Sequence, residues 1–272
     1  MGQFLEYVKM ALDNIRANKG RSFLTMLGII IGITSVVTIV SIGNGLKNDV
    51  VDATNVQTNT VTVQVNSEEV TRTDAITGDD ISFLRDALGD SVENITTTQT
   101  MSGKCTTRKG TFDAYVTMTT PDYENAQYTS PLVKGSYFTE NDTESGRPVC
   151  VIDELTARYL FGNTNVVGMS FELAIDSGIQ EVTILGVRET SDDMLEVEAT
   201  YQAMGMPESI SIEVPYTLSE AFGQPIEGFY SVSLTVADSE NTSRVASTAV
   251  QLLNSRHQDL GDTPFMQQRP ID

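Results

Sequence analysis

The sequence predicts one N-terminal transmembrane helix followed by an acidic α+β domain that is divided into two parts. Three observations lead to this fold class. No charged side chain occurs between Arg21 and Lys47, and short strand patterns and helix patterns then alternate along the chain. Turn residues interrupt these patterns near Thr120–Pro121 and near Gly228. A chain of 272 residues is long enough for one large domain or two small ones.

Residues 1–21 are predicted to form an amphipathic helix on the cytoplasmic side of a membrane. Charged side chains fall largely on one side of this helix, and apolar residues recur at helical spacing on the other, namely Phe4, Leu5, Val8, Ala11, Leu12 and Ile15. This pattern is typical of a helix that lies in the membrane interface. A helix packed on another protein surface is the alternative.

Residues 22–46 are predicted to cross the membrane as a helix. These uncharged residues would extend roughly 37 Å at about 1.5 Å per residue, and the hydrocarbon core of a bilayer needs about 20 residues. The apolar region of a signal peptide is usually only about 7–15 residues long. A retained span is therefore favoured over a cleaved signal or a buried soluble helix.

The charge distribution predicts the orientation of the chain. Four basic residues precede the span, so the N-terminus is expected in the cytoplasm and the bulk of the chain outside the cell membrane. The whole chain has a net charge of −20, and the part after residue 21 carries about −22. A domain this acidic lacks the basic surface that nucleic-acid binding requires.

Small residues inside the span indicate a surface for helix packing. Gly28 and Gly32 lie one turn apart in "GIIIG", and Ser35 follows about one turn later. Small residues at this spacing allow a second helix to approach closely within a membrane. The sequence therefore predicts partner helices that pack against Gly28, Gly32 and Ser35.

The outer region contains recognisable strands and helices. "NTVTVQV" places Val61, Val63 and Val65 on one strand face. "TGDDISFLRDALGD" predicts a helix capped by Asp79 or Asp80, with Gly89 at its end. Further strands and helices are predicted in "PVCVIDELTARYLFG", "QEVTILGV", "SISIEVP" and the long C-terminal stretch that begins with "FYSVSLTV", whereas "TENDTESG" is predicted to be an acidic loop.

The residue types needed for catalysis are scarce, and the sequence therefore predicts no enzyme activity, cofactor or metal. His257 is the single histidine, and the chain has no Gly-x-Ser-x-Gly or phosphate-binding Gly-x-x-x-x-Gly-Lys-Ser/Thr motif. Cys105, Cys150 and His257 are too scattered in the sequence to predict a zinc site. The two cysteines are expected to be buried free thiols in different parts of the domain.

The stretch "ALDNIRANKGRSFLTMLGIIIGITSVVTIVSIGNGL" resembles the start of MacB-like ABC transporter permeases of the MacB/FtsX superfamily. Later segments are similar to this family in the same order, including "PDYENAQYTSPLVKGSYFTENDTESGRPVCVIDELTARYLFGNTNVVGMSFEL", "IEVPYTLSEAFG" and "LLNSRHQDLGDTPFMQQRP". Asp153 and Ser136 depart from the family pattern, where glycine and arginine are frequent, which affects the expected turn geometry at these positions.

This resemblance implies four spans, with a large outer domain between the first and the second. Residues 50–119 and 230–272 would form a porter-like α+β part, and residues 121–229 an inserted β-rich, Sabre-like subdomain. The family pairs as dimers and is driven by an ABC-type ATPase, which here would be a separate chain. The outer domain would couple ATP cycling to the export or extracytoplasmic handling of peptides, lipoproteins or drugs, a process called mechanotransmission. The remaining three spans would follow Asp272.

A second functional hypothesis belongs to a different class. A stand-alone, membrane-anchored extracellular domain that binds or senses a ligand would also combine one span with a soluble acidic domain. The small-residue face of the span favours the permease, because a lone anchor needs no helix partner.

The predicted orientation can be tested with reporter fusions in intact cells. A reporter placed after Lys9 should be active in the cytoplasm, and one placed after Pro270 should be active outside, because positive flanking charge is retained inside. Cytoplasmic activity of the Pro270 fusion would overturn the predicted topology.

Overall fold

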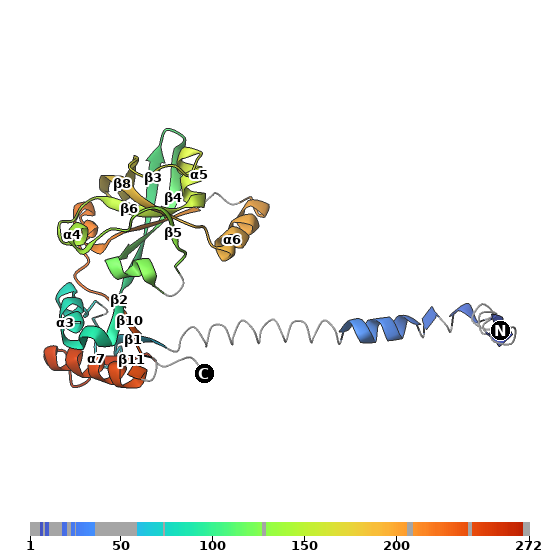
Figure 1. Ribbon diagram of the computed structural model, residues 1–272, viewed down its shortest axis with the longest axis horizontal. Helices are drawn as coiled ribbons and strands as arrows, with labels where there is room; N and C mark the ends of the chain where they lie inside the picture. Colours follow the sequence, from blue (N-terminus) through green and yellow to red (C-terminus); the bar gives the residue numbers. More distant parts are fainter. Residues whose placement is uncertain are drawn as a thin grey trace. The chain divides into compact units, whose positions relative to one another are not determined.

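A computed structural model describes residues 6–7, 9–10, 18–20, 23–24, 26–35, 59–72, 74–126, 129–205, 209–238 and 241–268. The chain divides into two compact units, residues 1–57 and residues 58–272 (Figure 1). Residues 26–35 of the first unit are helical, and their isoleucine side chains are exposed in this structure.

The structure leaves the predicted membrane span untested. Among the residues described, no helix combines the length and the apolar character that crossing a membrane requires. Residues 36–46 of the predicted span lie outside the described residues, as do most residues of the predicted amphipathic helix over 1–21. Both segments therefore remain predictions.

The second unit contains a four-stranded antiparallel sheet in the order β11-β1-β10-β2. Its strands are β1 (Thr60–Val65), β2 (Val92–Thr96), β10 (Ser231–Val236) and β11 (Phe265–Gln267). The predicted alternation is confirmed, because Val61, Val63 and Val65 are buried while their neighbours are half-buried. Val232, Leu234 and Val236 of β10 are buried on the same face of the sheet and contribute to the same core.

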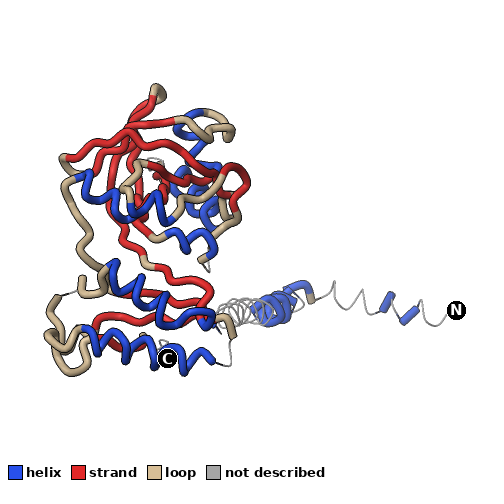
Figure 2. Tube along the Cα trace, turned by 60° about the vertical axis from the view of Figure 1, so that its left-hand side comes forward, coloured by secondary structure: helices blue, strands red, loops and turns tan. Residues whose placement is uncertain are grey.

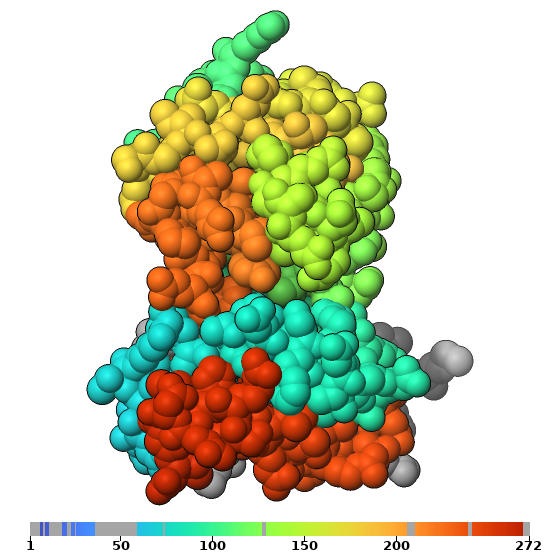
Figure 3. Space-filling view, turned by 90° about the vertical axis from the view of Figure 1, so that its left-hand side faces the viewer, coloured from blue at the N-terminus to red at the C-terminus, as the bar shows by residue number. Residues whose placement is uncertain are grey.

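Helices α3 (Gly78–Leu88) and α7 (Thr242–Arg256) supply the other half of this core (Figures 1 and 2). Figure 3 shows the two helices side by side on the surface, with α3 in blue-green and α7 in orange to red. The predicted helix end at Gly89 is confirmed by its positive φ of 48°. The predicted cap is wrong: Thr77 is the N-cap, and Asp80 is the third helical residue of a capping box.

The remaining strands form a sheet that closes on itself. The strand order is β5-β8-β6-β9-β4-β3-β7, and β7 also pairs with β8, so six strands form a closed barrel and β5 extends it. Thr183 of β8 pairs with Ser170 of β7 on one edge and with Val149 of β6 on the other. The strands are β3 (Thr98–Thr107), β4 (Gly110–Thr119), β5 (Leu132–Gly135), β6 (Val149–Asp153), β7 (Ser170–Ile175), β8 (Gly178–Arg188) and β9 (Ser209–Pro215).

Both cysteines lie in the barrel core, and both are free thiols. Both are buried, as predicted, but Cys105 on β3 and Cys150 on β6 share one core rather than lying in different parts. Residues 98–119 are predicted to belong to the porter-like part. In the structure they form strands β3 and β4, which pair with other strands of the barrel. The four-stranded sheet is formed from chain segments 60–96 and 231–267.

The barrel strands are connected by helices η3 (Pro121–Asn125), α4 (Glu140–Glu144), α5 (Glu154–Phe161) and α6 (Asp192–Ala203). Helix η2 (Gly89–Ser91) lies between α3 and β2, and η4 (Tyr216–Phe222) leads from β9 to β10. The acidic loop predicted at 139–146 is wrong, because Thr139 and Asp142 form a capping box that starts α4. Asp153 caps α5 by accepting a hydrogen bond from the Thr156 amide at 2.6 Å. Gly162 ends α5 in the left-handed conformation, as predicted.

Asp80 connects the two helices of the four-stranded sheet. Its buried carboxylate accepts hydrogen bonds from the Thr77 amide at 2.9 Å and from Arg256 Nε at 2.8 Å, and it lies 2.9 Å from His257 Nε2. Burial alone would raise the pKa of Asp80, but the hydrogen bonds from Thr77, His257 and Arg256 together hold that pKa below its usual value. The carboxylate is therefore most stable when ionised in the folded protein.

Replacing Asp80 with asparagine should lower the free energy of unfolding of a 58–272 fragment by about 2 kcal/mol near neutral pH. Because the folded pKa is depressed, this contribution is present above the unfolded pKa of about 4 and is lost as the pH falls through the folded pKa. Urea unfolding at several pH values should show that the difference in the free energy of unfolding between the wild type and Asp80→Asn becomes smaller in acid.

Asp79→Asn, an exposed neighbour in the same helical turn, is the control and should change the free energy of unfolding by only about 0.5 kcal/mol. If Asp80→Asn changed the free energy of unfolding equally at all pH values, the depressed pKa of Asp80 would be contradicted.

Candidate functional site at the junction between the two sheets

The four-stranded sheet and the barrel are joined where the chain passes directly from one to the other. Strand β2 continues through Thr97 into β3, which is the first crossing (Figure 1). The second crossing runs from β9 through η4 to β10. Helix η3, which follows β4 through Thr120, contacts β2 beside the first crossing. The contacts at this junction therefore determine how firmly one sheet is held to the other.

Threonine hydroxyls at the end of β4 and just after it bind the backbone at the first crossing. Thr119 Oγ1 donates to the Thr97 carbonyl at 2.6 Å, and Thr120 Oγ1 donates to the Ile95 carbonyl at 3.2 Å. Both threonines are buried. These hydrogen bonds satisfy carbonyl groups at the outer edge of β2, which would otherwise be left unpaired inside the protein.

Asp122 of η3 completes this edge. Its carboxylate accepts hydrogen bonds from the Ile95 amide at 2.8 Å and forms an ion pair with Arg85 of α3, also at 2.8 Å. The side chain of Asp122 is only 21% exposed, whereas that of Arg85 is 43% exposed. Burial also raises the pKa of nearby Glu140, and Arg85 partly offsets this effect. Asp122 therefore connects η3 to both a strand and a helix of the four-stranded sheet.

Arg188 connects the same short helix to the barrel. Arg188 is 4% exposed, and its Nε donates to both carboxylate oxygens of Glu213, at 3.0 and 3.1 Å. It also donates to the carbonyl groups of Tyr123, Glu124 and Ser130. Strand β8, strand β9 and η3 are thus held by one side chain.

Tyr137 covers the remaining face of this ion pair. Its hydroxyl donates to Glu213 Oε2 at 2.7 Å, and its ring lies 5.0 Å from the Arg188 guanidinium carbon. Burial raises the pKa of Glu213, and Arg188 offsets this only in part. Burial and the Glu213 carboxylate also raise the pKa of Tyr137, so its hydroxyl stays a hydrogen-bond donor.

Tyr216 joins the two hydrophobic cores at the second crossing. Its ring packs against both cores and meets Phe229 edge-on, with ring centroids 5.3 Å apart. Gly78 lies against this ring, because a Cβ at position 78 would be 2.5 Å from the tyrosine hydroxyl. The junction is therefore packed as well as hydrogen-bonded.

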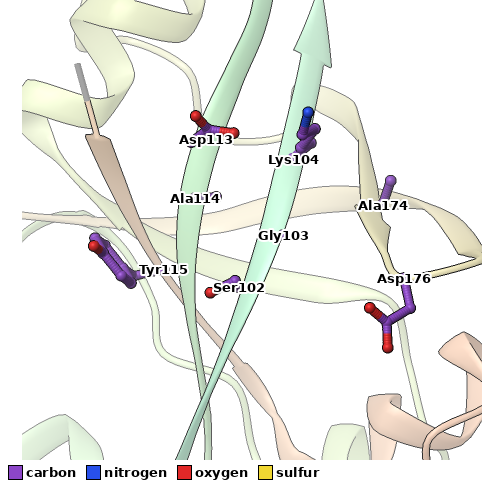
Figure 4. A pocket seen from close by; sticks show the side chains of 8 residues that line it. All are labelled: Ser102, Gly103, Lys104, Asp113, Ala114, Tyr115, Ala174 and Asp176. Carbon is purple, nitrogen blue, oxygen red and sulfur yellow. The ribbon is translucent and has the colours of Figure 1, made fainter. Parts of the chain in front are cut away.

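The chemistry of the described residues gives no sign of a catalytic centre. Within those residues, no group of three or more histidine, cysteine, aspartate and glutamate side chains could hold a metal ion. His257 is engaged with Asp80, and burial raises the pKa of both cysteine thiols. A hollow of about 490 Å³ on strands β3 and β4 is lined by Ser102, Gly103, Lys104, Asp113, Ala114, Tyr115, Ala174 and Asp176 (Figure 4).

The residues predicted for helix packing remain untested. No atom lies within 4 Å of a Cβ placed at Gly28 or Gly32, and Ser35 Oγ donates to the Ile31 carbonyl at 2.8 Å within its own helix. The junction residues Asp122 and Arg188 were not predicted from the sequence. Asp122 follows Pro121 in a turn signal, and Arg188 comes directly after the predicted strand "QEVTILGV", so neither stands out among the 54 charged residues.

Replacing Arg188 with methionine should destabilise the 58–272 fragment by about 3–5 kcal/mol, because Glu213 would keep a buried charge without a partner. Denaturant unfolding measures this loss. Arg158→Met is the matched control, since Arg158 is 56% exposed and 3.9 Å from Glu154, and it should cost no more than about 1 kcal/mol. Equal effects of the two substitutions would show that Arg188 does not hold the junction.

Comparison with known proteins reveals the family of the chain. The model of the MacB-like periplasmic core domain matches residues 22–252. The macrolide export ATP-binding/permease protein MacB of Vibrio parahaemolyticus is 30% identical over 264 residues, covering 93% of this chain and 37% of that protein. The uncharacterized ABC transporter permease YknZ of Bacillus subtilis is 29% identical over 262 residues, covering 93% of this chain and 61% of that protein.

The chain thus spans between about two fifths and three fifths of the length of these curated relatives. Two solved structures share its fold. The extracellular domain of the transporter YknZ from Gram-positive bacteria has a TM-score of 0.57 at 21% identity, covering 78% of this chain and 100% of that chain. The periplasmic region of MacB from Actinobacillus actinomycetemcomitans has a TM-score of 0.58 at 17% identity, covering 77% of this chain and 88% of that chain.

The mixed α+β fold and the match over most of the chain agree with each other. The chain belongs to the MacB-like periplasmic core domain family, and its bulk is the extracytoplasmic domain of an ABC transporter permease.

Proposed function

We propose that this domain transmits movement between membrane helices and an extracytoplasmic barrel, in a permease driven by a separate ABC-type ATPase. The observation that carries this proposal is the position of the two ends of the domain. The Gln268 amide donates to the Thr62 carbonyl at 2.8 Å, and β11 pairs antiparallel with β1. The chain therefore enters and leaves at the same end of the four-stranded sheet.

This arrangement suits a domain inserted between two membrane spans. The segment before β1 contains the predicted span 22–46, and a second span would follow Asp272. Movement of either span would reach β1 or β11 first, because these strands are the nearest ordered elements in the sequence. Both strands belong to the hydrogen-bonded four-stranded sheet, so the sheet would move as one body.

The junction would then carry this movement to the barrel. Asp122, Arg188 and Tyr216 join the sheet to the barrel through buried hydrogen bonds, an ion pair and aromatic packing. Buried and well-packed contacts resist deformation, whereas an exposed linker would not. We propose that the porter-like part comprises 59–96 and 231–268, and that 98–229 form the insertion, which moves the first boundary from 120 to Thr97.

The chemistry of transport would belong to other parts of the assembly. We propose that the partner ATPase hydrolyses ATP and that this chain contributes no catalytic residue. The material moved would be a peptide, lipoprotein or drug, and the complete permease would act as a homodimer or as one half of a paired permease. Packing of Gly28, Gly32 and Ser35 against a partner helix would hold the pair together in the membrane.

Distance measurements in the complete transporter test this proposal. Spin labels at position 109, one on each permease copy in lipid vesicles with the ATPase, should change their separation when a non-hydrolysable ATP analogue binds. Asp122→Asn should reduce this change and broaden the distance distribution while ATP hydrolysis continues, because Arg85 and the Ile95 amide lose their charged partner.

Asp86→Asn is the matched control, since Asp86 is an exposed residue of α3 near the same junction. It should leave both the distance change and hydrolysis as in the wild type. A separation that does not respond to nucleotide in the wild-type transporter would overturn mechanotransmission. A gene without further apolar segments beyond Asp272 would instead support the stand-alone binding or sensory domain.

A further inference from the structure

Strand β3 has an edge that is only partly covered. Strand β4 pairs with β3 along its whole length, from Thr98 to Thr107, without a register shift. On the opposite edge, β7 pairs with residues 104–106 alone and then turns away at Asp176. Residues 98–102 therefore have a strand partner on one side only.

The register identifies which backbone groups face the open edge. The β3–β4 loop has two residues, so Thr107 and Gly110 form a hydrogen-bonded pair, and every second pair along the hairpin does the same. Gln99, Met101 and Gly103 consequently bond to β4. The amide and carbonyl groups of Thr98, Thr100 and Ser102 point toward the opposite, open edge. Those of Lys104 point the same way and are paired by β7.

Nothing in the described part of the chain satisfies this row of backbone groups. No hydrogen bond from another described residue reaches the backbone of Thr98, Thr100 or Ser102 at that edge. The same edge continues in β2 as Asn94 and Thr96, where β10 pairs with it. The edge is therefore covered by a strand in β2 and open in β3.

Proteins usually protect such an edge with proline, a charged side chain, a bulge or a covering loop. The sequence "TQTMS" at 98–102 contains no proline and no charge, and no bulge interrupts its pairing with β4. Threonine, which occurs at both 98 and 100, favours extended backbone. The open edge thus has the composition of a strand that accepts a neighbour.

A hollow lies beside this edge. It opens at the fork where β7 leaves β3, between Ser102 and Asp176, and extends across β4 to Tyr115 (Figure 4). The Tyr115 side chain is 54% exposed and offers a flat apolar surface. Asp113 and Asp176 contribute two carboxylates to the lining and Lys104 one ammonium, so the hollow favours a basic side chain.

We propose that an extended segment of a partner polypeptide binds here as an added β-strand beside residues 98–102. Main-chain hydrogen bonds to Thr98, Thr100 and Ser102 would supply affinity, and a basic side chain near Asp113 and Asp176 would supply selectivity. A second copy of this acidic chain is a poor occupant, because each copy has a net charge of −20 and the two repel each other.

Selection of displayed random ten-residue peptides against the whole 272-residue chain in detergent tests the proposal. Selected peptides should carry lysine or arginine, and Thr100→Pro should weaken their binding at least about tenfold by removing one edge amide. Thr100→Val is the matched control and should bind within about twofold of the wild type, because its backbone groups are unchanged.

Hydrogen exchange supplies the second measurement. The amides of Thr98, Thr100 and Ser102 should exchange rapidly in the free chain and slowly with peptide, while those of Gln99 and Met101 stay protected in both states. Peptides with N-methyl groups on alternate backbone nitrogens should lose binding to the wild-type chain, which keeps the test valid if Thr100→Pro fails to fold.

Three outcomes would overturn the proposal. One is a selection that yields no binder to the edge. The second is protection of the three edge amides in the isolated chain at every concentration, which would show that another part of the same chain covers the edge. The third is protection that rises with protein concentration without peptide, which would assign the edge to contact between two copies.

Discussion

The structure of the outer domain depends above all on the buried guanidinium of Arg188. One planar side chain satisfies the carboxylate of Glu213 and three backbone carbonyl groups of residues 123–130. Those carbonyl groups belong to η3 and the loop after it, and neither segment is part of a barrel strand. Arg188 therefore fixes the position of Asp122, and Asp122 in turn holds the edge of β2 and the side chain of Arg85. A chain of contacts runs from the barrel wall to α3 through a single short helix.

The order of the strands along the chain makes such a junction necessary. The four-stranded sheet takes its strands from both ends of the domain, since β1 and β2 precede the barrel and β10 and β11 follow it. The barrel is consequently an insertion that must leave the sheet and return to it. Because β2 runs straight into β3 through Thr97, little flexible chain separates the two bodies, and side-chain contacts at Thr119, Thr120 and Tyr216 fill the gap.

Local features of this fold could be predicted from the sequence because they depend on neighbouring residues. The alternation of Val61, Val63 and Val65 follows from the two-residue repeat of a strand, and the apolar stripe of α3 follows from the repeat of a helix. The cap at Thr77 was missed because Asp79 and Asp80 are equally good capping residues, and only the backbone geometry distinguishes them. The closed barrel was missed because closure depends on β7 meeting two strands at once, a non-local pairing that no single segment encodes. For the same reason Cys105 was placed apart from Cys150, although their strands share one core.

The placement of the few basic residues also explains how so acidic a domain stays compact. The chain has 37 acidic and 17 basic residues, so general repulsion opposes folding. Three carboxylates with little exposure have cationic partners, namely Asp80 with Arg256, Glu213 with Arg188 and Asp142 with Arg147. Buried Glu198 instead accepts hydrogen bonds from Tyr159 and Gln202. Most other carboxylates face water, where solvent and salt screen their repulsion. The excess negative charge therefore lies on the surface, where it maintains solubility and favours basic partners, while the buried carboxylates are held by cations or by neutral hydrogen-bond donors.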